Sequence, residues 1–317
     1  MLRVLAKTED GDFYMPEKEK DTPQAERVLC LATGQHFNNG HKFYQFEPIL
    51  DEASQEEVFA RCEMPEMAEA FIRRGKNCNV LVYGPTNSGK THTMIGPQED
   101  RRKTPRDSQQ GILPRALQLI LREYQTHQKG FIAKNFALKF SALEIYNDQL
   151  TDLTNDSAKP VEIRELKHHG KEHTILRNLA ETPIKTLDDA NELLAHALAK
   201  RQVQETTKNM ASSRSHAVFI VKLYSQMAGG GSDDIFGAYG SAYGQKHQAM
   251  QRQLEMETNL VSSFIFVDLA GSEKLDGESN KQQQLEAKHI NKSLSALGNV
   301  IAALKNGSQM HIPYRDS

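Results

Sequence analysis

Cysteine is scarce in this chain of 317 residues, which contains only Cys30, Cys62 and Cys78. The three thiols are widely spaced and odd in number, so they predict neither a disulfide framework nor a cysteine zinc site. We interpret them as three ordinary thiols in a reducing compartment. The class of small secreted proteins stapled by disulfides is thereby excluded.

Long apolar runs and an excess of charge are also missing. No stretch reaches the roughly 18 consecutive apolar residues of a membrane-spanning helix, and the N-terminus lacks the apolar run of a signal peptide. The formal net charge is −2, so no global basic field indicates nucleic acid as a partner, and an acidic partner must meet a local patch. The expectation is a cytoplasmic protein that binds neither membrane nor nucleic acid.

The composition that remains is that of a folded domain, with 38% hydrophobic and 25% charged residues. Strand-like and helix-like segments alternate without an internal repeat. This order predicts one α/β domain over residues 1–317, with a central, mainly parallel, twisted sheet and helices on both faces. Strands are predicted at residues 78–83, 136–146, 217–225 and 260–269, and helices at residues 114–125, 187–200 and 285–305.

Three polar stretches interrupt this alternation. Residues 96–110 contain two prolines and predict a surface loop, and residues 154–173 form a polar excursion rich in lysine and histidine. Residues 226–259 begin with three glycines and lack apolar periodicity, which predicts a mobile insert within the domain.

A phosphate-binding loop is predicted directly after the strand at residues 78–83. Residues 84–91 read Gly-Pro-Thr-Asn-Ser-Gly-Lys-Thr, the pattern G-x-x-x-x-G-K-[ST]. Small residues let successive backbone N–H groups point inward as an anion nest, and the following helix adds its positive end. A chance Gly/Ser loop is the alternative, and the position after an apolar strand argues against it. Lys90 is predicted to contact the β- and γ-phosphates, and Thr91 to ligate Mg²⁺. The predicted nucleotide contacts are Gly84, Pro85, Thr86, Asn87, Ser88, Gly89, Lys90 and Thr91.

Two further segments resemble nucleotide sensors. Residues 260–273 form an apolar strand that ends in Asp268, which could hold Mg²⁺ through a water, while the Gly271 N–H could sense the γ-phosphate. A buried strand followed by an ordinary turn is the alternative. Residues 209–216 read Asn-Met-Ala-Ser-Ser-Arg-Ser-His, and taken alone they fit a helix cap or a solvated loop equally well.

Three motifs of this chain occur together in kinesin motor domains: N-x-x-S-S-R-S-H, D-L-A-G-S-E, and a phosphate loop that continues into Thr-His-Thr-Met. The chain therefore resembles that family. Residues 111–115, 143–148, 289–294 and 312–317 match further family segments, so the resemblance covers essentially the whole chain. It implies a P-loop NTPase fold, microtubule-stimulated ATP hydrolysis, the cofactors ATP and Mg²⁺, and a cytoskeletal location.

The resemblance also implies roles for individual residues. Ser213 would join Thr91 and Asp268 around Mg²⁺, and Ser212 would contact the γ-phosphate or the attacking water. Arg214 and Glu273 would pair as a latch that closes on triphosphate. The predicted catalytic residues are Ser212, Ser213, Arg214, Gly271 and Glu273, and positioning and charge stabilisation replace a strong base.

The chain departs from the family pattern at the predicted site for the adenine base and in the phosphate loop. An Arg-x-Arg-Pro opening is only partly matched by residues 3–6, Arg-Val-Leu-Ala, so Arg3 and His92 are left to contact adenine. Pro85 and Asn87 replace the more usual residues of the loop. Asn tolerates a positive φ, so we still expect the loop to form.

The helix at residues 285–305 carries one apolar stripe at spacing 4-3-4-3, formed by Ile290, Leu294, Leu297, Ile301 and Leu304. Lys288 and Lys292 lie off the stripe, which predicts a lever with a basic face toward acidic tubulin; a merely solvated charged face is the alternative. The predicted microtubule contacts are Lys274, Lys281, Lys288, Lys292, His311 and Arg315, with the basic cluster at residues 167–173 as a candidate neighbour.

Two other functions compete with a motor ATPase. One is a kinesin-like module that binds microtubules without efficient turnover, and the other is a GTPase-like switch with a protein effector. Residues 289–294 and 312–317 argue against the second. The residues that argue against the first are intact Lys90, Thr91, Arg214, Asp268 and Glu273. In the family, a further helix, an edge strand, a final helix and a neck linker follow the last matched segment. We therefore expect an incomplete motor whose apolar stripe is partly exposed.

Overall fold

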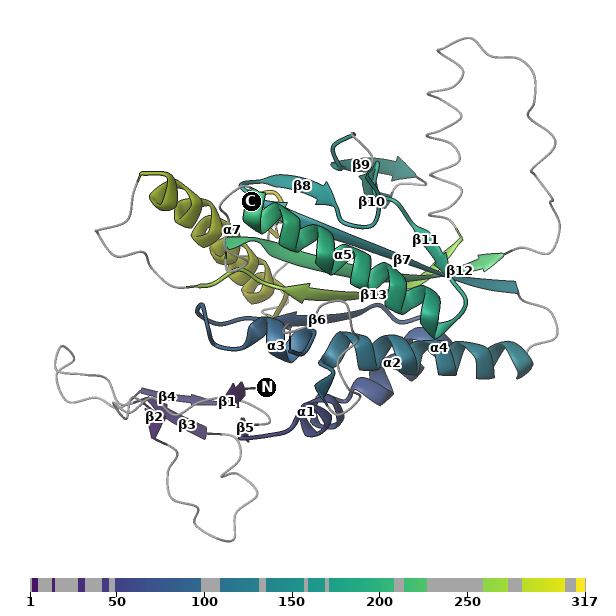
Figure 1. Cartoon of the computed structure of the whole chain (residues 1–317), viewed down its shortest axis with the longest axis horizontal. Coiled ribbons are helices and arrows are strands. Elements are labelled where there is room, and N and C mark those ends of the chain that lie inside the picture. The colour runs from purple at the N-terminus through teal and green to yellow at the C-terminus, as the bar shows by residue number, and fades with distance from the viewer. Residues whose placement is uncertain are drawn as a thin grey trace, which may run out of the picture.

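The computed structural model has a central β-sheet with helices packed against it (Figure 1). The residues that it describes are 2–4, 13–14, 28–31, 42–45, 49–97, 109–130, 135–156, 159–168, 171–207, 214–226, 259–272, 281–305 and 312–316.

The central sheet is built from strands that the apolar pattern of the sequence largely predicts. Its spatial order is β11 (Thr182–Ile184), β7 (Asn135–Tyr146), β12 (His216–Gln226), β13 (Leu260–Asp268) and β6 (Cys78–Val82), and β8 (Gln149–Asp152) pairs with β7. Strands β13 and β6 run parallel, in register from Phe264 opposite Cys78 to Asp268 opposite Val82. The carboxyl ends of these two strands therefore finish side by side.

The expected α/β fold class is confirmed, with a refinement of the strand directions. Parallel pairing holds for β6 and β13, whereas β12 pairs antiparallel with β13 and β7, and β11 pairs antiparallel with β7. Strands β7 and β8 are joined by a tight turn at Asn147 and Asp148, whose φ angles are 48° and 60°. Such a turn reverses the chain and gives an antiparallel neighbour.

Helices α2 (Met64–Arg74), α4 (Ile112–Gly130) and α5 (Leu187–Thr207) pack on one face of the sheet, and Figure 1 shows α5 crossing it. Side chains of alternate strand residues meet these helices, because successive residues of a strand face opposite sides. The largest fully buried side chains of this core include Phe71, Phe140, Phe219, Phe264 and Phe266.

Two short helices complete this part of the fold, of which α1 (Gln55–Arg61) packs on α2 and α4, and α3 (Lys90–Met94) packs on β6 and β13. Helix α1 begins at Ser54 with a capping box, in which Ser54 Oγ accepts from Glu57 N and Glu57 Oε2 accepts from Ser54 N. Helix α3 follows the loop after β6. Helix α7 (Lys281–Lys305) lies beside the end of the sheet where β13 finishes (Figure 1).

The remaining strands form small separate sheets. Strand β1 (Leu2–Val4) pairs with β5 (Ile49–Asp51), and β2 (Phe13–Tyr14), β3 (Val28–Leu31) and β4 (Lys42–Gln45) form another sheet. The predicted polar excursion at residues 154–173 is corrected in part, because β9 (Glu162–His168) and β10 (Lys171–Arg177) form an antiparallel hairpin there. Of the described apolar side chains of this hairpin, Ile175 is buried and Ile163 is exposed, so they give no apolar alternation like that of a packed strand.

Two predicted loops lie largely outside the described residues, namely most of 96–110 and nearly all of 226–259. Among the helices in the described part of the chain, none combines the length and the apolar character needed to cross a lipid bilayer.

Candidate nucleotide-binding site

The loop between β6 and α3 has the backbone geometry that the phosphate-loop motif requires. Asn87 has a φ of 62° and Gly89 a φ of 79°, so two of its residues adopt the left-handed conformation. The expectation that Asn tolerates this position is confirmed. At Gly84 an added Cβ would lie 2.6 Å from Ser88 Oγ, so a larger residue would distort the loop. Lys90 Nζ donates to Pro85 O at 2.7 Å, which holds the cation over the loop.

Thr91 and Asp268 are brought together, although they are 177 residues apart in the sequence. Thr91 Oγ1 donates to Asp268 Oδ2 at 2.7 Å. The parallel register explains the contact, because Asp268 lies opposite Val82, directly before the phosphate loop. A hydroxyl and a carboxylate from two different motifs thus share one position at the carboxyl edge of the sheet.

A buried arginine, Arg201 of α5, covers this edge. Glu144 of β7 and Asp268 of β13 flank Ala217 of β12 in register, so both carboxylates lie in one row across three strands. Arg201 Nη1 donates to Asp268 Oδ2 at 3.1 Å, and its Nε lies 3.6 Å from Glu144 Oε1. Ser215 Oγ also donates to Glu144 Oε1, at 2.6 Å.

This row fits a divalent cation. The side chains of Arg201, Glu144 and Asp268 are at most 4% exposed, and two carboxylates against one guanidinium leave one net negative charge. Buried charge is costly unless a counter-charge or hydrogen bonds satisfy it. Among the described residues, Asp268 Oδ1 is buried without a hydrogen-bond partner. Hydroxyl and carboxylate oxygens are ligands that Mg²⁺ prefers, so the side chains of Thr91 and Asp268 suit that ion.

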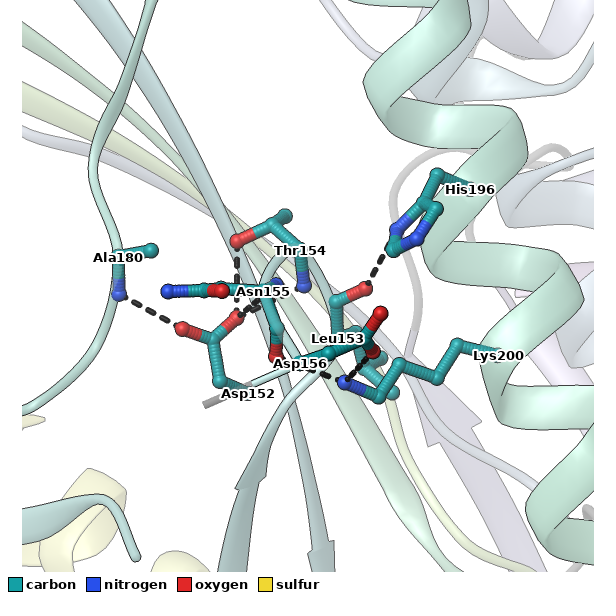
Figure 2. Close-up of polar contacts among 8 residues, drawn as sticks. All are labelled: Asp152, Leu153, Thr154, Asn155, Asp156, Ala180, His196 and Lys200. Carbon is teal, nitrogen blue, oxygen red and sulfur yellow. Dashed lines mark hydrogen bonds and ion pairs between the residues drawn. The ribbon is translucent and has the colours of Figure 1, made fainter. Parts of the chain in front are cut away.

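Helix α5, which supplies Arg201, is fixed by the turn that follows β8 (Figure 2). Lys200 Nζ donates to Asn155 O at 2.7 Å and to Asp156 Oδ1 at 2.8 Å. One turn earlier, His196 Nδ1 lies 3.2 Å from Leu153 O. These contacts immediately precede Arg201, so they set the position of α5 relative to the sheet.

Asp152 organises the same turn. Its Oδ1 accepts from Thr154 N, Thr154 Oγ1 and Asn155 N, and its Oδ2 accepts from Ala180 N at 2.7 Å (Figure 2). A carboxylate that accepts several backbone N–H bonds holds a turn rigidly. The turn can therefore serve as a fixed support for Lys200 and His196.

His92, predicted to contact the base, is oriented by a residue that the sequence analysis did not assign to the site. The Gln55 amide nitrogen donates to His92 O at 2.7 Å and lies 3.1 Å from His92 Nδ1. Gln55 is buried, whereas His92 is exposed. The imidazole is thus held on one side and open to solvent on the other.

The segment after β13 runs along the start of the phosphate loop. Leu269 N donates to Val82 O at 3.3 Å, and Ser272 N donates to Gly84 O at 3.2 Å. Between these bonds, Ala270 N donates to His216 Nδ1 at 3.0 Å. Burial and, secondly, the Arg201 guanidinium lower the pKa of His216 from 6.5 to about 4, although Asp268 acts in the opposite direction. The imidazole is therefore neutral near pH 7.

Several predicted site residues lie outside the described residues: Ser212, Ser213, Glu273, Lys274 and His311. Arg214 is half-buried in the turn before β12, and its pairing with Glu273 remains a prediction. Gly271 is buried beside the phosphate loop. Arg3 lies on β1 opposite Leu50 of β5, and its contact with adenine also remains a prediction.

The predicted filament face is partly described. Lys288 and Lys292 of α7 are both exposed, whereas only the backbone of Lys281 is described. Arg315 forms an ion pair with Glu165 of β9, so its charge is shared with the β9–β10 hairpin. The apolar stripe of α7 is exposed at Ile301 and Leu304, by 52% and 54%, as expected.

Arg201 and Glu144 are site residues that sequence reasoning missed, although a signal was present. Ala190, Leu194, Ala197 and Arg201 follow the helical spacing 4-3-4, and all four are buried. A charged residue that continues an apolar stripe indicates a buried ion pair. Glu144 continues the buried alternation of β7 in the same way.

Comparison with known proteins points in one direction. The family model described as kinesin motor domain matches residues 17–317. Kinesin heavy chain of Drosophila melanogaster is 34% identical over 278 residues, which cover 87% of this chain and 24% of that protein. Kinesin heavy chain isoform 5C of Homo sapiens is 32% identical over 309 residues, 97% of this chain and 27% of that protein.

A solved structure has the same fold. It is described as a fast kinesin, with implications for ATPase mechanism and interactions with microtubules. Its TM-score is 0.68 at 26% identity, over 93% of this chain and 72% of that chain. This chain spans about a quarter of the length of the two curated relatives above.

Proposed function

Because the chain belongs to the kinesin motor-domain family, we propose that it binds ATP with Mg²⁺ at residues 84–91, hydrolyses it, and couples hydrolysis to microtubule binding. The observation that carries this proposal is the contact between Thr91 and Asp268. A phosphate loop alone predicts nucleotide binding only. A hydroxyl and a buried carboxylate joined at its end supply the oxygen donors that a hydrolytic magnesium site needs.

Phosphoryl transfer needs positioned charge rather than a strong base. Lys90 is proposed to hold the β- and γ-phosphates, and Thr91, Ser213 and Asp268 to hold Mg²⁺, which neutralises the charge that develops on the phosphate oxygens. Ser212 is proposed to position the attacking water. Arg201 holds the Asp268 carboxylate toward Thr91, since both side chains donate to the same carboxylate oxygen.

Closure on triphosphate is proposed to involve Gly271, Arg214 and Glu273. Gly271 would donate its N–H to the γ-phosphate, and Arg214 would pair with Glu273. The proposal is supported by the position of residues 269–272, which are hydrogen-bonded to the start of the phosphate loop. A small displacement of the γ-phosphate would therefore shift residues 269–272 directly.

Filament binding is proposed for the exposed lysines of α7 and their neighbours. Lys288 and Lys292 are exposed at one helical spacing, and an acidic filament surface would be attracted by them. The proposed filament-binding surface also includes Lys274, Lys281, His311 and Arg315. A protein that binds microtubules in this way would be located on the cytoplasmic cytoskeleton.

Replacing Lys90 tests the phosphate site. Lys90→Ala should abolish ATP hydrolysis, because no other cation of the loop is proposed to reach the β- and γ-phosphates. Lys76→Ala is the matched control, since Lys76 is an exposed lysine in the turn before β6. Circular dichroism must show that both variants are folded. Unchanged hydrolysis in folded Lys90→Ala would overturn the assignment of this site.

A further inference from the structure

His216 joins three parts of the molecule that are far apart in the sequence. It is the first residue of β12 and the last residue of the motif at residues 209–216, and it is 8% exposed. Its Nδ1 accepts from Ala270 N at 3.0 Å, and its Nε2 lies 3.1 Å from Ser293 Oγ of α7. Ala270 belongs to the turn beside the phosphate loop, so the imidazole stands between that turn and α7.

The hydrogen bonds around this ring have one consistent direction. A backbone N–H can only donate, so Nδ1 must accept, and the neutral ring carries its proton on Nε2. Nε2–H then donates to Ser293 Oγ. The Ser293 hydroxyl in turn donates to Ile290 O at 2.8 Å. Each donor and each acceptor in the chain from Ala270 to Ile290 is used once, so only a neutral imidazole completes it.

Few of the described side chains of helix α7 are buried. Between Lys288 and Lys305, Ala296 is the one residue of the helix that is buried in the described structure. In the same part of α7, His289 Nδ1 lies 2.9 Å from Asp148 Oδ2, and both of these side chains are about half exposed. Where a stretch of helix buries few side chains, a part-buried hydrogen bond contributes strongly to its position.

We propose that His216 is the positioning residue that transmits movement of residues 269–272 to α7, through its bonds to Ala270 and Ser293. The same turn is bonded to Val82 and Gly84, so the path begins at the phosphate loop. Because β12 side chains alternate, Ala217 faces the α5 side while His216 faces α7. The inference rests on the proposed function in one respect, namely that ATP binds at the phosphate loop. The movement of residues 269–272 and α7 does not require microtubules.

Hydrogen exchange of the α7 amides, without filaments, tests the link. The protein is measured with Mg²⁺ and ADP and again with Mg²⁺ and a non-hydrolysable ATP analogue. Wild-type protein should show a difference in exchange over residues 288–300 between the two nucleotides. Ser293→Ala should reduce that difference about fivefold, the scale of one lost hydrogen bond. Ser293→Thr, which keeps the hydroxyl, should restore it.

Ser262→Ala is the matched control, because Ser262 is a buried serine whose Oγ donates to Phe71 O at 2.9 Å, on the other side of the sheet. It should leave the α7 difference unchanged. His216→Gln keeps an N–H donor for Ser293 but loses the acceptor for Ala270, so it should reduce the difference as Ser293→Ala does. Turnover without filaments should stay within about twofold of wild type in Ser293→Ala, since Ser293 is bonded to His216 and Ile290, neither of which is proposed to contact the phosphates.

Each outcome decides the inference. A wild-type α7 that responds equally to both nucleotides would overturn it, and so would an unchanged response in Ser293→Ala or His216→Gln. If α7 responds and the variants lose the response, but microtubules never stimulate turnover, then the proposed motor function fails while the role of His216 stands.

Discussion

Replacement of Arg201 by Met removes the guanidinium from the buried row and keeps most of the apolar stem. Asp268 and Glu144, each 1% exposed, would then face each other without their counter-charge. Removing one partner of such a buried group costs about 3–5 kcal/mol of folding free energy. This is a large fraction of the roughly 5–15 kcal/mol that stabilises a folded domain.

Lys200→Met is the matched control for this change. Lys200 is the preceding residue of α5, and its partner Asp156 has a side chain that is 83% exposed. An ion pair of this kind contributes about 1 kcal/mol or less. Arg, Lys and Met have similar helix propensities, so the two variants differ chiefly in the burial of the pair that is broken.

Urea unfolding at one pH and salt concentration measures both costs. The slope of free energy against urea should be unchanged in both variants, which shows that the change is one of stability alone. We expect Arg201→Met to lower the free energy of unfolding by at least about 2 kcal/mol more than Lys200→Met does. Equal losses would refute the buried row as a structural unit.

Three further predictions concern pH, filament binding and the latch. The pKa of His216 is about 4 in the folded state and 6.5 in the unfolded state, so the unfolded chain binds a proton first and the folded state loses stability as the pH falls below 6.5. The free energy of unfolding of wild type, relative to that of His216→Gln, should therefore fall by about 2 kcal/mol between pH 7 and pH 5. A difference between the two proteins that stays constant with pH in urea unfolding would contradict this. Charge reversal at Lys288 or Lys292 should weaken microtubule co-sedimentation roughly threefold to tenfold, and added salt should weaken it further, whereas Lys76→Glu on the α2 side should have little effect. Arg214→Ala and Glu273→Ala should each stop microtubule-stimulated turnover, and the double variant should be no worse; additive losses in this cycle would mean that the two residues are not one latch.

The phosphate loop and the position of Asp268 beside it were predictable because their signals are local. The motif at residues 84–91 fixes the loop, and an apolar strand that ends in Asp268 predicts a carboxylate at the sheet edge. Two parallel strands place their carboxyl ends together, so Thr91 and Asp268 meet without further information. Asn87 at φ 62° shows that turn chemistry was also readable.

Arg201, Glu144 and His216 could not be assigned in the same way, because their roles depend on which strands lie side by side. Residues Ala217, Glu144 and Asp268 form one row only after β12 is inserted between β7 and β13. The alternation of strands and helices predicts mainly parallel strands, but strand direction depends on connections that periodicity does not report. The Asn147–Asp148 turn was the local clue to the antiparallel part.

The hairpin of β9 and β10 escaped prediction for a different reason. Its strands are joined by backbone pairing, and Ile163 on β9 is 58% exposed whereas Ile175 on β10 is buried. Single apolar residues of this kind give no regular alternation for a periodicity search to detect. The paired backbone was therefore invisible in a sequence rich in lysine, histidine and glutamate.

Steady-state ATP hydrolysis by this chain, with Mg²⁺ and with or without microtubules, tests the central claim most directly. The account predicts a low rate for the chain alone and a rate that rises and saturates as microtubules are added. GTP in place of ATP, as a parallel series, tests the GTPase-like alternative. Co-sedimentation without any rise in turnover would identify a binding module instead, and equal rates with and without microtubules would contradict the proposed motor function.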